Sequence, residues 1–294
     1  NSEYCQMISI YRLFRICKEV SSKYTLSKVR KKIPKEFAYI IDELLHVDYS
    51  DENKRVYYEE IIHTVIDTQV ADAFIAALCV LIQNLTIDSL HIIGDIFDRG
   101  PRADIIMDEL LRFHDVDIQG GNHDISWRGA ATGNEACVCN VLRIAISYNS
   151  FDVLEDGYGI NLRPLSMFAA RVYKDDPCSR FTPKILDENI YDVVDPGLVA
   201  KMHKAIAVIQ FKVEGQIIKR HPEYEMRDRL LLEAVDYKKG IVMIGGKEHP
   251  MLDMDFPTID PADPLKLTKE EQELLHTLAL SFKHSGLLHK HIRF

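Results

Sequence analysis

The sequence predicts a helix-rich α/β fold in which a small β-α-β unit lies between large helical additions on both sides. Apolar residues recur at helical spacing through most of the chain. In its middle, the runs IDSLHIIGD and VDIQGGN have the length and composition of short buried strands, and they flank a helical pattern at 103–114. With 294 residues, 47% of them hydrophobic, the chain can bury a large core.

Residues 1–85 are predicted to form a helical segment. Apolar residues from Ile10 to Val20 share one helix face, and the same spacing continues through FAYIIDELL and VYYEEIIHTVI. The run AFIAALCVLI at 73–82 is about half of the roughly 20 residues that a membrane span needs, so we interpret it as a buried helix. The cationic stretch at 21–37 is interpreted as a solvated loop, because the charge around it is acidic.

Residues 86–150 contain the β-α-β unit and the strongest chemical signal of the chain. GDIFDRG at 94–100 follows the first predicted strand, and GNHD at 121–124 follows the second. Loops at the carboxyl ends of neighbouring parallel strands converge at one edge of a sheet. We therefore expect these two cassettes to meet in space.

Residues 151–294 return largely to helical patterns, as in LRPLSMFAARVY and LVAKMHKAIAVIQFKVEGQII. A short strand is expected at 241–246, followed by an irregular stretch rich in proline. Thr268 and Glu271 form a capping box, which predicts a helix from 269 to about 283.

The first cassette supplies three candidate site residues. The carboxylate of Asp95 can bridge two divalent ions, which makes it the main candidate metal ligand. Asp98 is assigned to orient His123, because a carboxylate that accepts an N–H from imidazole fixes its tautomer. Arg99 carries a forked cation that can bind two phosphate oxygens. This combination indicates phosphate chemistry.

The second cassette supplies a metal ligand and an acid. The side-chain oxygen of Asn122 is a neutral ligand for a hard cation, and His123 can donate a proton to a departing alkoxide. Two metal ions about 3.5 to 4 Å apart would activate a bridging water for in-line attack. Taken singly, each residue has a structural alternative, a surface salt bridge or a turn. Together, in this order, they predict metal-assisted hydrolysis of a phosphate ester.

The amino-acid composition limits the expected binding partners and indicates the cellular compartment. A net charge of −9 gives no basic face for a nucleic acid, and no apolar run is long enough to predict a membrane partner. The first residues have polar breaks where a secretory signal needs a continuous apolar stretch. The six cysteines are scattered, which favours a reducing cytoplasm; the pair Cys137 and Cys139 receives no role.

The cassettes resemble those of the calcineurin-like metallophosphoesterases, which include the Ser/Thr protein phosphatases. The wider sequence, from FAYIIDELL to MLDMDFPTID, resembles the class III fructose-1,6-bisphosphatases of bacteria. This resemblance implies hydrolysis of the 1-phosphate of a sugar bisphosphate to give fructose 6-phosphate, a gluconeogenic step of carbohydrate metabolism. It also implies a two-metal site with manganese, with magnesium as the second candidate. The oligomeric state is left undecided, and a homo-oligomer is possible.

Parts of the family pattern have no match in this sequence. Neither the Asp-x-His-Gly cassette nor the metal histidines in Gly-His contexts are found, and the start at NSEYC suggests a piece of a longer protein. The pair His289 and His291 is interpreted as a polar helix end, since a spacing of two places side chains on different helix faces. Asp124 stands where the protein phosphatases have Glu. The cations without an assigned role are Arg128, Arg143, Arg171 and Lys184.

Two alternatives remain beside the sugar phosphatase. The same cassettes suit a metallophosphoesterase that acts on phosphoproteins or dinucleotide polyphosphates. The predominance of helix and the unmatched metal ligands suit a non-catalytic binding or regulatory segment.

Overall fold

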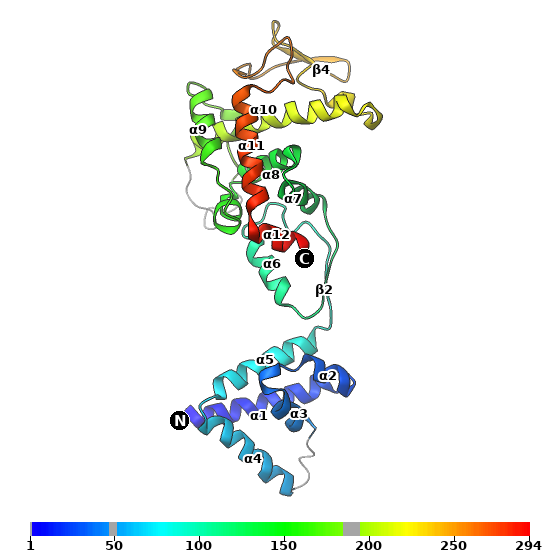
Figure 1. The fold of residues 1–294 in the computed structure, drawn as a ribbon, viewed down its shortest axis with the longest axis vertical. Coiled ribbons are helices and arrows are strands. Elements are labelled where there is room, and N and C mark those ends of the chain that lie inside the picture. The colour runs from blue at the N-terminus through cyan, green and yellow to red at the C-terminus, as the bar shows by residue number, and fades with distance from the viewer. Residues whose placement is uncertain (1, 47–51, 185–194) are drawn as a thin grey trace. The chain divides into compact units, whose positions relative to one another are not determined.

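The structure of the protein is a computed structural model that describes residues 2–46, 52–184 and 195–294. Helices predominate, and the strands of the described residues form one sheet of two strands and one of three (Figure 1). The prediction of a helix-rich α/β fold is confirmed.

The chain divides into two compact units. The first contains Asn1–Ile92 and Phe113–Asp117, and the second contains Ile93–Arg112 and Ile118–Phe294. Each unit is described on its own below. The domain boundaries expected near residues 85 and 150 stay predictions.

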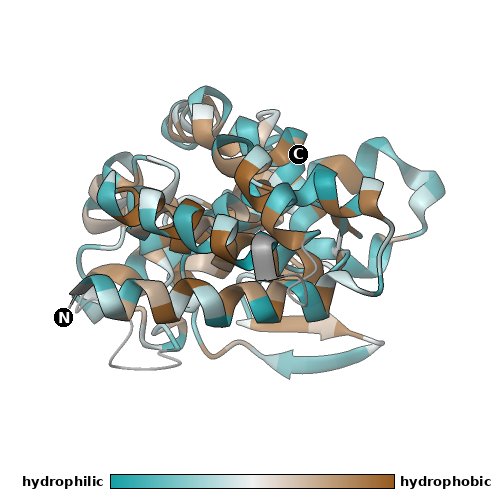
Figure 2. Ribbon diagram, turned by 90° about the horizontal axis from the view of Figure 1, so that it is seen from below, coloured by the Kyte–Doolittle hydropathy of each residue, from teal (hydrophilic) through white to brown (hydrophobic). Residues whose placement is uncertain are grey.

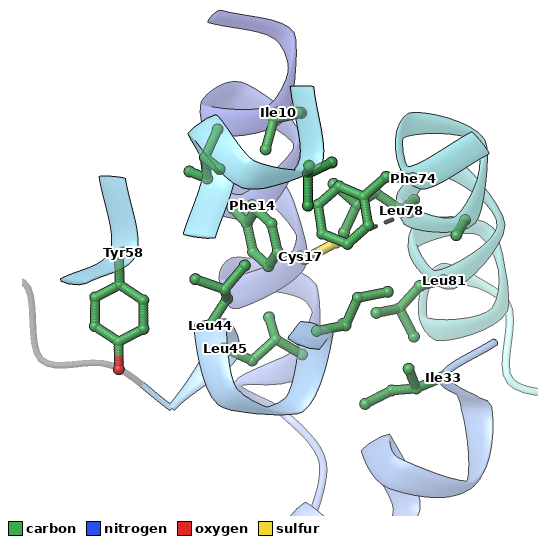
Figure 3. Close-up of a cluster of buried hydrophobic side chains, with 14 of the residues drawn as sticks. Ile10, Phe14, Cys17, Ile33, Leu44, Leu45, Tyr58, Phe74, Leu78 and Leu81 are labelled. Carbon is green, nitrogen blue, oxygen red and sulfur yellow. Dashed lines mark hydrogen bonds between the residues drawn. The ribbon is translucent and has the colours of Figure 1, made fainter. Parts of the chain in front are cut away.

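The first unit is a helical layer around one apolar core. Figure 3 shows Phe14 and Cys17 of the first helix facing Phe74 and Leu78 of the fifth. The rings of Phe14 and Phe74 have their centroids 5.9 Å apart. The helix that begins at the N label in Figure 2 alternates hydrophobic and hydrophilic residues, as a helix with one buried face should. The helices of this unit are α1 (Ser2–Ser21), α2 (Leu26–Lys32), α3 (Ala38–Leu45), α4 (Glu52–Asp67) and α5 (Ala71–Thr86).

The run at 73–82 lies within α5 and buries Phe74, Leu78 and Leu81, so the prediction of a buried helix is confirmed. None of the described helices is long and apolar enough to cross a membrane by itself. Helices α4 and α5 meet such a criterion only as a pair, which is bent by 117°.

The prediction of a loop over residues 21–37 is wrong for Leu26–Lys32, which form α2. The helix forms because Val29 is buried in the core, while Lys28 and Lys32 both form ion pairs with Asp88. These pairs lower the pKa of Asp88 to about 2. Local charge patterns do not reveal ion-pair partners that lie about 60 residues away in the sequence.

The β-α-β unit consists of β1 (Leu90–Ile92), α6 (Ala103–Arg112) and β2 (Val116–Ile118). The two strands pair, and the backbone N–H of Leu90 donates to the carbonyl oxygen of Asp115 at 3.0 Å. Both strands are shorter than the apolar runs suggested, and GDIFDRG and GNHD begin within three residues of the strand ends.

In the second unit, helices surround the long helix α10, whose side chains are buried on several faces. Asp195 caps its start by accepting from the Gly197 N–H, with Pro196 in the first turn. The predicted capping box of Thr268 and Glu271 is confirmed at the start of α11. The other helices are α7 (Asn122–Ala131), α8 (Glu135–Ser147), α9 (Arg163–Val172), α10 (Pro196–Arg220), α11 (Lys269–His284) and α12 (Gly286–Arg293).

A three-stranded antiparallel sheet follows α10. It contains β3 (Val235–Asp236), β4 (Ile241–Ile244) and β5 (Lys247–Pro250), and only β4 was predicted. Figure 2 shows why: β4 is coloured hydrophobic and β5 hydrophilic, so β5 lacks the apolar signal of a strand. Its pairing is fixed instead by a two-residue turn in which Gly245 and Gly246 both have positive φ.

Two lysines of α10 are buried with carboxylate partners. Lys212 Nζ lies 2.8 Å from Glu271 Oε2, so the residue that caps α11 also forms a buried ion pair. Lys204 Nζ lies 2.5 Å from Asp176 and 2.6 Å from Asp253. These pairs attach the proline-rich stretch and the start of α11 to α10, and they place charge inside the second unit.

Candidate functional site

The two cassettes meet in the second unit, and two glycines allow the contact. Gly94 has a φ of 91°, and a Cβ atom there would lie 2.5 Å from the backbone nitrogen of Gly121. A Cβ atom on Gly121 would lie 2.2 Å from Asp95 Oδ1. Both distances are too short for any side chain, so glycine is required at each position. The expected convergence of the cassettes is what the structure shows.

Asp95 directly contacts the start of α7. Its Oδ1 accepts from the backbone N–H of His123 at 3.1 Å. This is the bond that an N-cap side chain would make, and the glycine at the cap position has none. Asp95 also has a φ of 53°, in the left-handed region that non-glycine residues seldom adopt. The start of α7 thus holds Asp95, the proposed metal ligand, which is exposed to solvent.

Asp124 links the two cassettes, a role that sequence reasoning missed. Its Oδ2 accepts from the backbone N–H groups of Asp95 (2.7 Å) and Gly121 (2.9 Å). Its Oδ1 accepts from the N–H of Phe97 at 3.2 Å. The bond to Gly121 is half of a capping box, and an acidic residue three positions after the cap was the available signal. The bonds to the first cassette had no local signal.

Asp98, Arg99 and His123 form one polar cluster. His123 Nε2 lies 3.0 Å from Asp98 Oδ1, and Arg99 Nε donates to the same oxygen at 3.1 Å. The His123 side chain is 15% exposed and that of Arg99 is 49% exposed, so the imidazole is sheltered while the guanidinium reaches solvent. The structure brings together three of the five site residues predicted from the sequence, and their roles stay a prediction.

Aromatic rings support the cluster from inside the unit. In the sequence, Phe97 lies between Asp95 and Asp98. The centroid of its ring is 5.0 Å from that of Trp127 and 6.1 Å from that of Tyr158. Burial raises the pKa of Tyr158, whose phenol oxygen lies 3.0 Å from His291 Nδ1. A cavity with room for about one water molecule, lined by Phe97, Asp98, His123, Ser126 and Trp127, lies beside these rings.

His291 is buried, whereas a polar helix end was expected. Its Nε2 lies 3.2 Å from Asp108 Oδ1, and its Nδ1 contacts Tyr158. His289 instead places Nε2 2.8 Å from the carbonyl oxygen of Lys283. The two histidines therefore have separate partners.

Asp95 and Asn122 are the candidate metal ligands of this chain. Asn122 is the first residue of α7, and its side chain is exposed. Their oxygens are of the kind that hard divalent cations prefer. Among the described residues, however, no group of three or more His, Cys, Asp or Glu side chains is arranged to hold a metal ion. The donors fit a divalent metal in kind but are too few to complete a site.

Two of the unassigned arginines have side-chain partners outside the cluster, and the third lines another pocket. Arg143 Nε donates to Gln210 Oε1 at 2.6 Å. Arg171 forms an exposed ion pair with Glu270 at 2.8 Å. Arg128 lines a different pocket, together with Arg293. The structure places none of these three arginines beside Asp98 and His123.

Comparison with known proteins identifies related sequences along the whole chain. The model of the family described as Firmicute fructose-1,6-bisphosphatase matches residues 1–294. Three of the related proteins, all named fructose-1,6-bisphosphatase class 3, illustrate the similarity. That of Listeria innocua serovar 6a is 52% identical over 97% of this chain and 44% of its own length. Those of Clostridium novyi (strain NT) and Bacteroides fragilis (strain YCH46) are each 54% identical over 98% of this chain and 43% of their own length.

The chain thus spans less than half of the length of these relatives. No solved structure matches it.

Proposed function

Since this chain belongs to the Firmicute fructose-1,6-bisphosphatase family, we propose that the whole protein hydrolyses fructose 1,6-bisphosphate to fructose 6-phosphate and phosphate. The cluster of Asp98, Arg99 and His123 carries the proposal, because it joins a phosphate-binding cation to an acid and its orienting carboxylate. Gluconeogenesis in the cytoplasm is the proposed setting.

In this proposal Arg99 binds the transferring phosphoryl group, and its guanidinium neutralises charge on the phosphate oxygens. Asp98 holds Nε2 of His123, so that Nδ1 is the nitrogen that gives its proton to the departing sugar oxygen. The sheltered position of the imidazole strengthens its interaction with the carboxylate. Asp98 is thus a positioning residue and His123 a catalytic acid.

The proposal includes a divalent metal, with manganese preferred and magnesium as the second choice. Asp95 and Asn122 would supply two of its ligands, and we propose that residues of the whole protein beyond those described here supply further ones. Family resemblance assigns to the metal the activation of the attacking water. The expected consequence is that Asp95→Asn weakens manganese binding by the whole protein, measured by calorimetry. Unchanged affinity would remove Asp95 from the ligand set.

The wider arrangement is also a proposal. Residues 86–150 would form part of a calcineurin-like core, with helical regions before and after it.

A substrate panel tests the proposed function. The whole protein, with manganese added, would be offered fructose 1,6-bisphosphate, a phosphopeptide and a dinucleotide polyphosphate at equal concentration, and phosphate release would be measured. We expect turnover of the sugar bisphosphate. Preferential turnover of a rival substrate would replace the substrate assignment, and no turnover of any would favour a non-catalytic role for these cassettes.

A further inference from the structure

A second cation lies near Arg99, on the ring of Tyr148 at the end of α8. The guanidinium carbon Cζ of Arg99 is 5.0 Å from the centroid of this ring, and Lys184 Nζ is 5.8 Å from it. Both distances are within the range of cation–π attraction. Lys184 is 85 positions from Arg99 in the sequence and has an exposed side chain, so the fold rather than the local sequence brings the two cations to one ring.

One backbone hydrogen bond and one side-chain hydrogen bond hold this arrangement in place. The N–H of Lys184 donates to the carbonyl oxygen of Ser147 at 2.7 Å, which ties its segment to the last turn of α8. The hydroxyl of Ser150 donates to the carbonyl oxygen of Arg99 at 3.2 Å, which ties the first cassette to the residues after α8. Lys184 and Arg99 are therefore each held at the backbone, and Tyr148 lies between these two attachments in the sequence.

The contacts have an order that gives Lys184 a distinct place. His123 contacts Asp98, Asp98 contacts Arg99, and Arg99 and Lys184 share Tyr148. Lys184 is thus at the far end of this series from His123. If the reacting phosphoryl group binds near His123 and Arg99, Lys184 remains available to bind another part of the same substrate.

Charge favours an anionic ligand at this end. The Asp98 carboxylate is shared by Arg99 and His123, and among the described residues no carboxylate forms an ion pair with Lys184. A purely structural explanation also exists, because cations at a helix C-terminus interact favourably with the helix dipole. That explanation predicts effects on stability but none on the choice of substrate.

We propose that Lys184, positioned by Tyr148, binds the second phosphate of a sugar bisphosphate and thereby selects bisphosphates over monophosphates. The proposal rests on the proposed function of the cluster around Asp98 and His123. Arg99 binds the phosphoryl group that is cleaved, and Lys184 binds the one that stays on the sugar.

The test compares two substrates in the whole protein with manganese. Lys184→Met should lower kcat/KM for fructose 1,6-bisphosphate about tenfold, the effect of losing one hydrogen bond to a charged group, mainly through KM. It should leave kcat/KM for fructose 1-phosphate unchanged, because that substrate has no second phosphate. Lys184→Arg should retain most of the preference. Lys247→Met, at an exposed lysine of β5, is the matched control and should affect neither substrate.

The ring is tested in the same assay. Tyr148→Phe keeps the aromatic face and should behave as the unaltered protein. Tyr148→Leu also removes the ring beside Arg99, so it should lower kcat/KM for both substrates, and more for the bisphosphate. Equal losses with both substrates in Lys184→Met, or no loss with either, would overturn the proposal for Lys184. Hydrolysis of fructose 1,6-bisphosphate by the unaltered protein would still support the proposed function.

If the unaltered protein does not hydrolyse fructose 1,6-bisphosphate, the proposed function fails, and calorimetric binding of the two sugars still decides on Lys184. Weaker binding of the bisphosphate alone in Lys184→Met supports the proposal. Identical affinities, or no binding to the unaltered protein, reject it.

Discussion

Asp124→Asn tests whether a single buried carboxylate holds the two cassettes together. Asp124 is 7% exposed and accepts three backbone N–H groups, from Asp95, Phe97 and Gly121. Asparagine has nearly the same shape, so the change removes the charge and one acceptor without opening a cavity. The other acceptor survives as a neutral amide oxygen.

The expected loss follows from these three bonds. With the amide oxygen in the place of Oδ2, the bonds from Asp95 and Gly121 persist, and the amide NH₂ faces the N–H of Phe97. A hydrogen bond to a charged group contributes about 1.5 to 3 kcal/mol and one between neutral groups about 0.5 to 1.5 kcal/mol. Losing one charged bond and weakening two should therefore lower the free energy of unfolding by about 3.5 to 6 kcal/mol.

The assay is urea denaturation followed by tryptophan fluorescence. Trp127 is the only tryptophan of the chain, and its ring lies 5.0 Å from that of Phe97, so its emission reports on the cassettes. Asp228→Asn, at an exposed position of the same unit, controls for the loss of one negative charge. A loss below about 1 kcal/mol in Asp124→Asn would refute the account of Asp124, since surface changes have effects of about 0.5 kcal/mol.

Three further changes have defined outcomes. Lys212→Met should lower the free energy of unfolding by about 3 to 5 kcal/mol, because it leaves the Glu271 carboxylate buried without its cation; a loss within the error of urea denaturation would argue against the pair. Gly121→Ala should displace Asp95 and weaken manganese binding in calorimetry, and full affinity would contradict the close contact. Burial lowers the pKa of His203. Between the unfolded-state pKa of about 6.5 and the lower folded pKa, the unfolded chain binds the proton more readily, so this contribution to stability is present above about pH 6.5 and is lost as the pH falls. His203→Gln should flatten this part of the pH profile of stability, and an unchanged slope would contradict it.

Features encoded by neighbouring residues could be predicted from the sequence. The capping box of Thr268 and Glu271 fixes the start of α11 within one turn, and both residues are close in the chain. The run at 73–82 shows its helical period directly. The meeting of the cassettes was also predictable, because the rule for strand ends applies to any β-α-β unit.

Features that depend on distant partners were not predictable. Helix α2 is stabilised by Asp88, and β5 by pairing with β4, and neither segment has a strong signal of its own. Within the site, Asp95 serves as a cap for a helix that begins 27 positions later. Lys184 had no context in the sequence, and its place near Arg99 depends on the hydrogen bond to Ser147. Long-range contacts of this kind require the fold.

The most direct test of the proposed chemistry is the effect of His123→Asn on two phosphate esters with different leaving groups. Hydrolysis of fructose 1,6-bisphosphate and of p-nitrophenyl phosphate would be measured in the whole protein with manganese. A general acid contributes about 10²- to 10⁴-fold for a poor leaving group such as a sugar alkoxide and much less for p-nitrophenolate. The account predicts a loss of about 100-fold or more with the sugar bisphosphate and a far smaller loss with the aryl ester. Equal losses with both, or full activity of His123→Asn on the sugar bisphosphate, would contradict it.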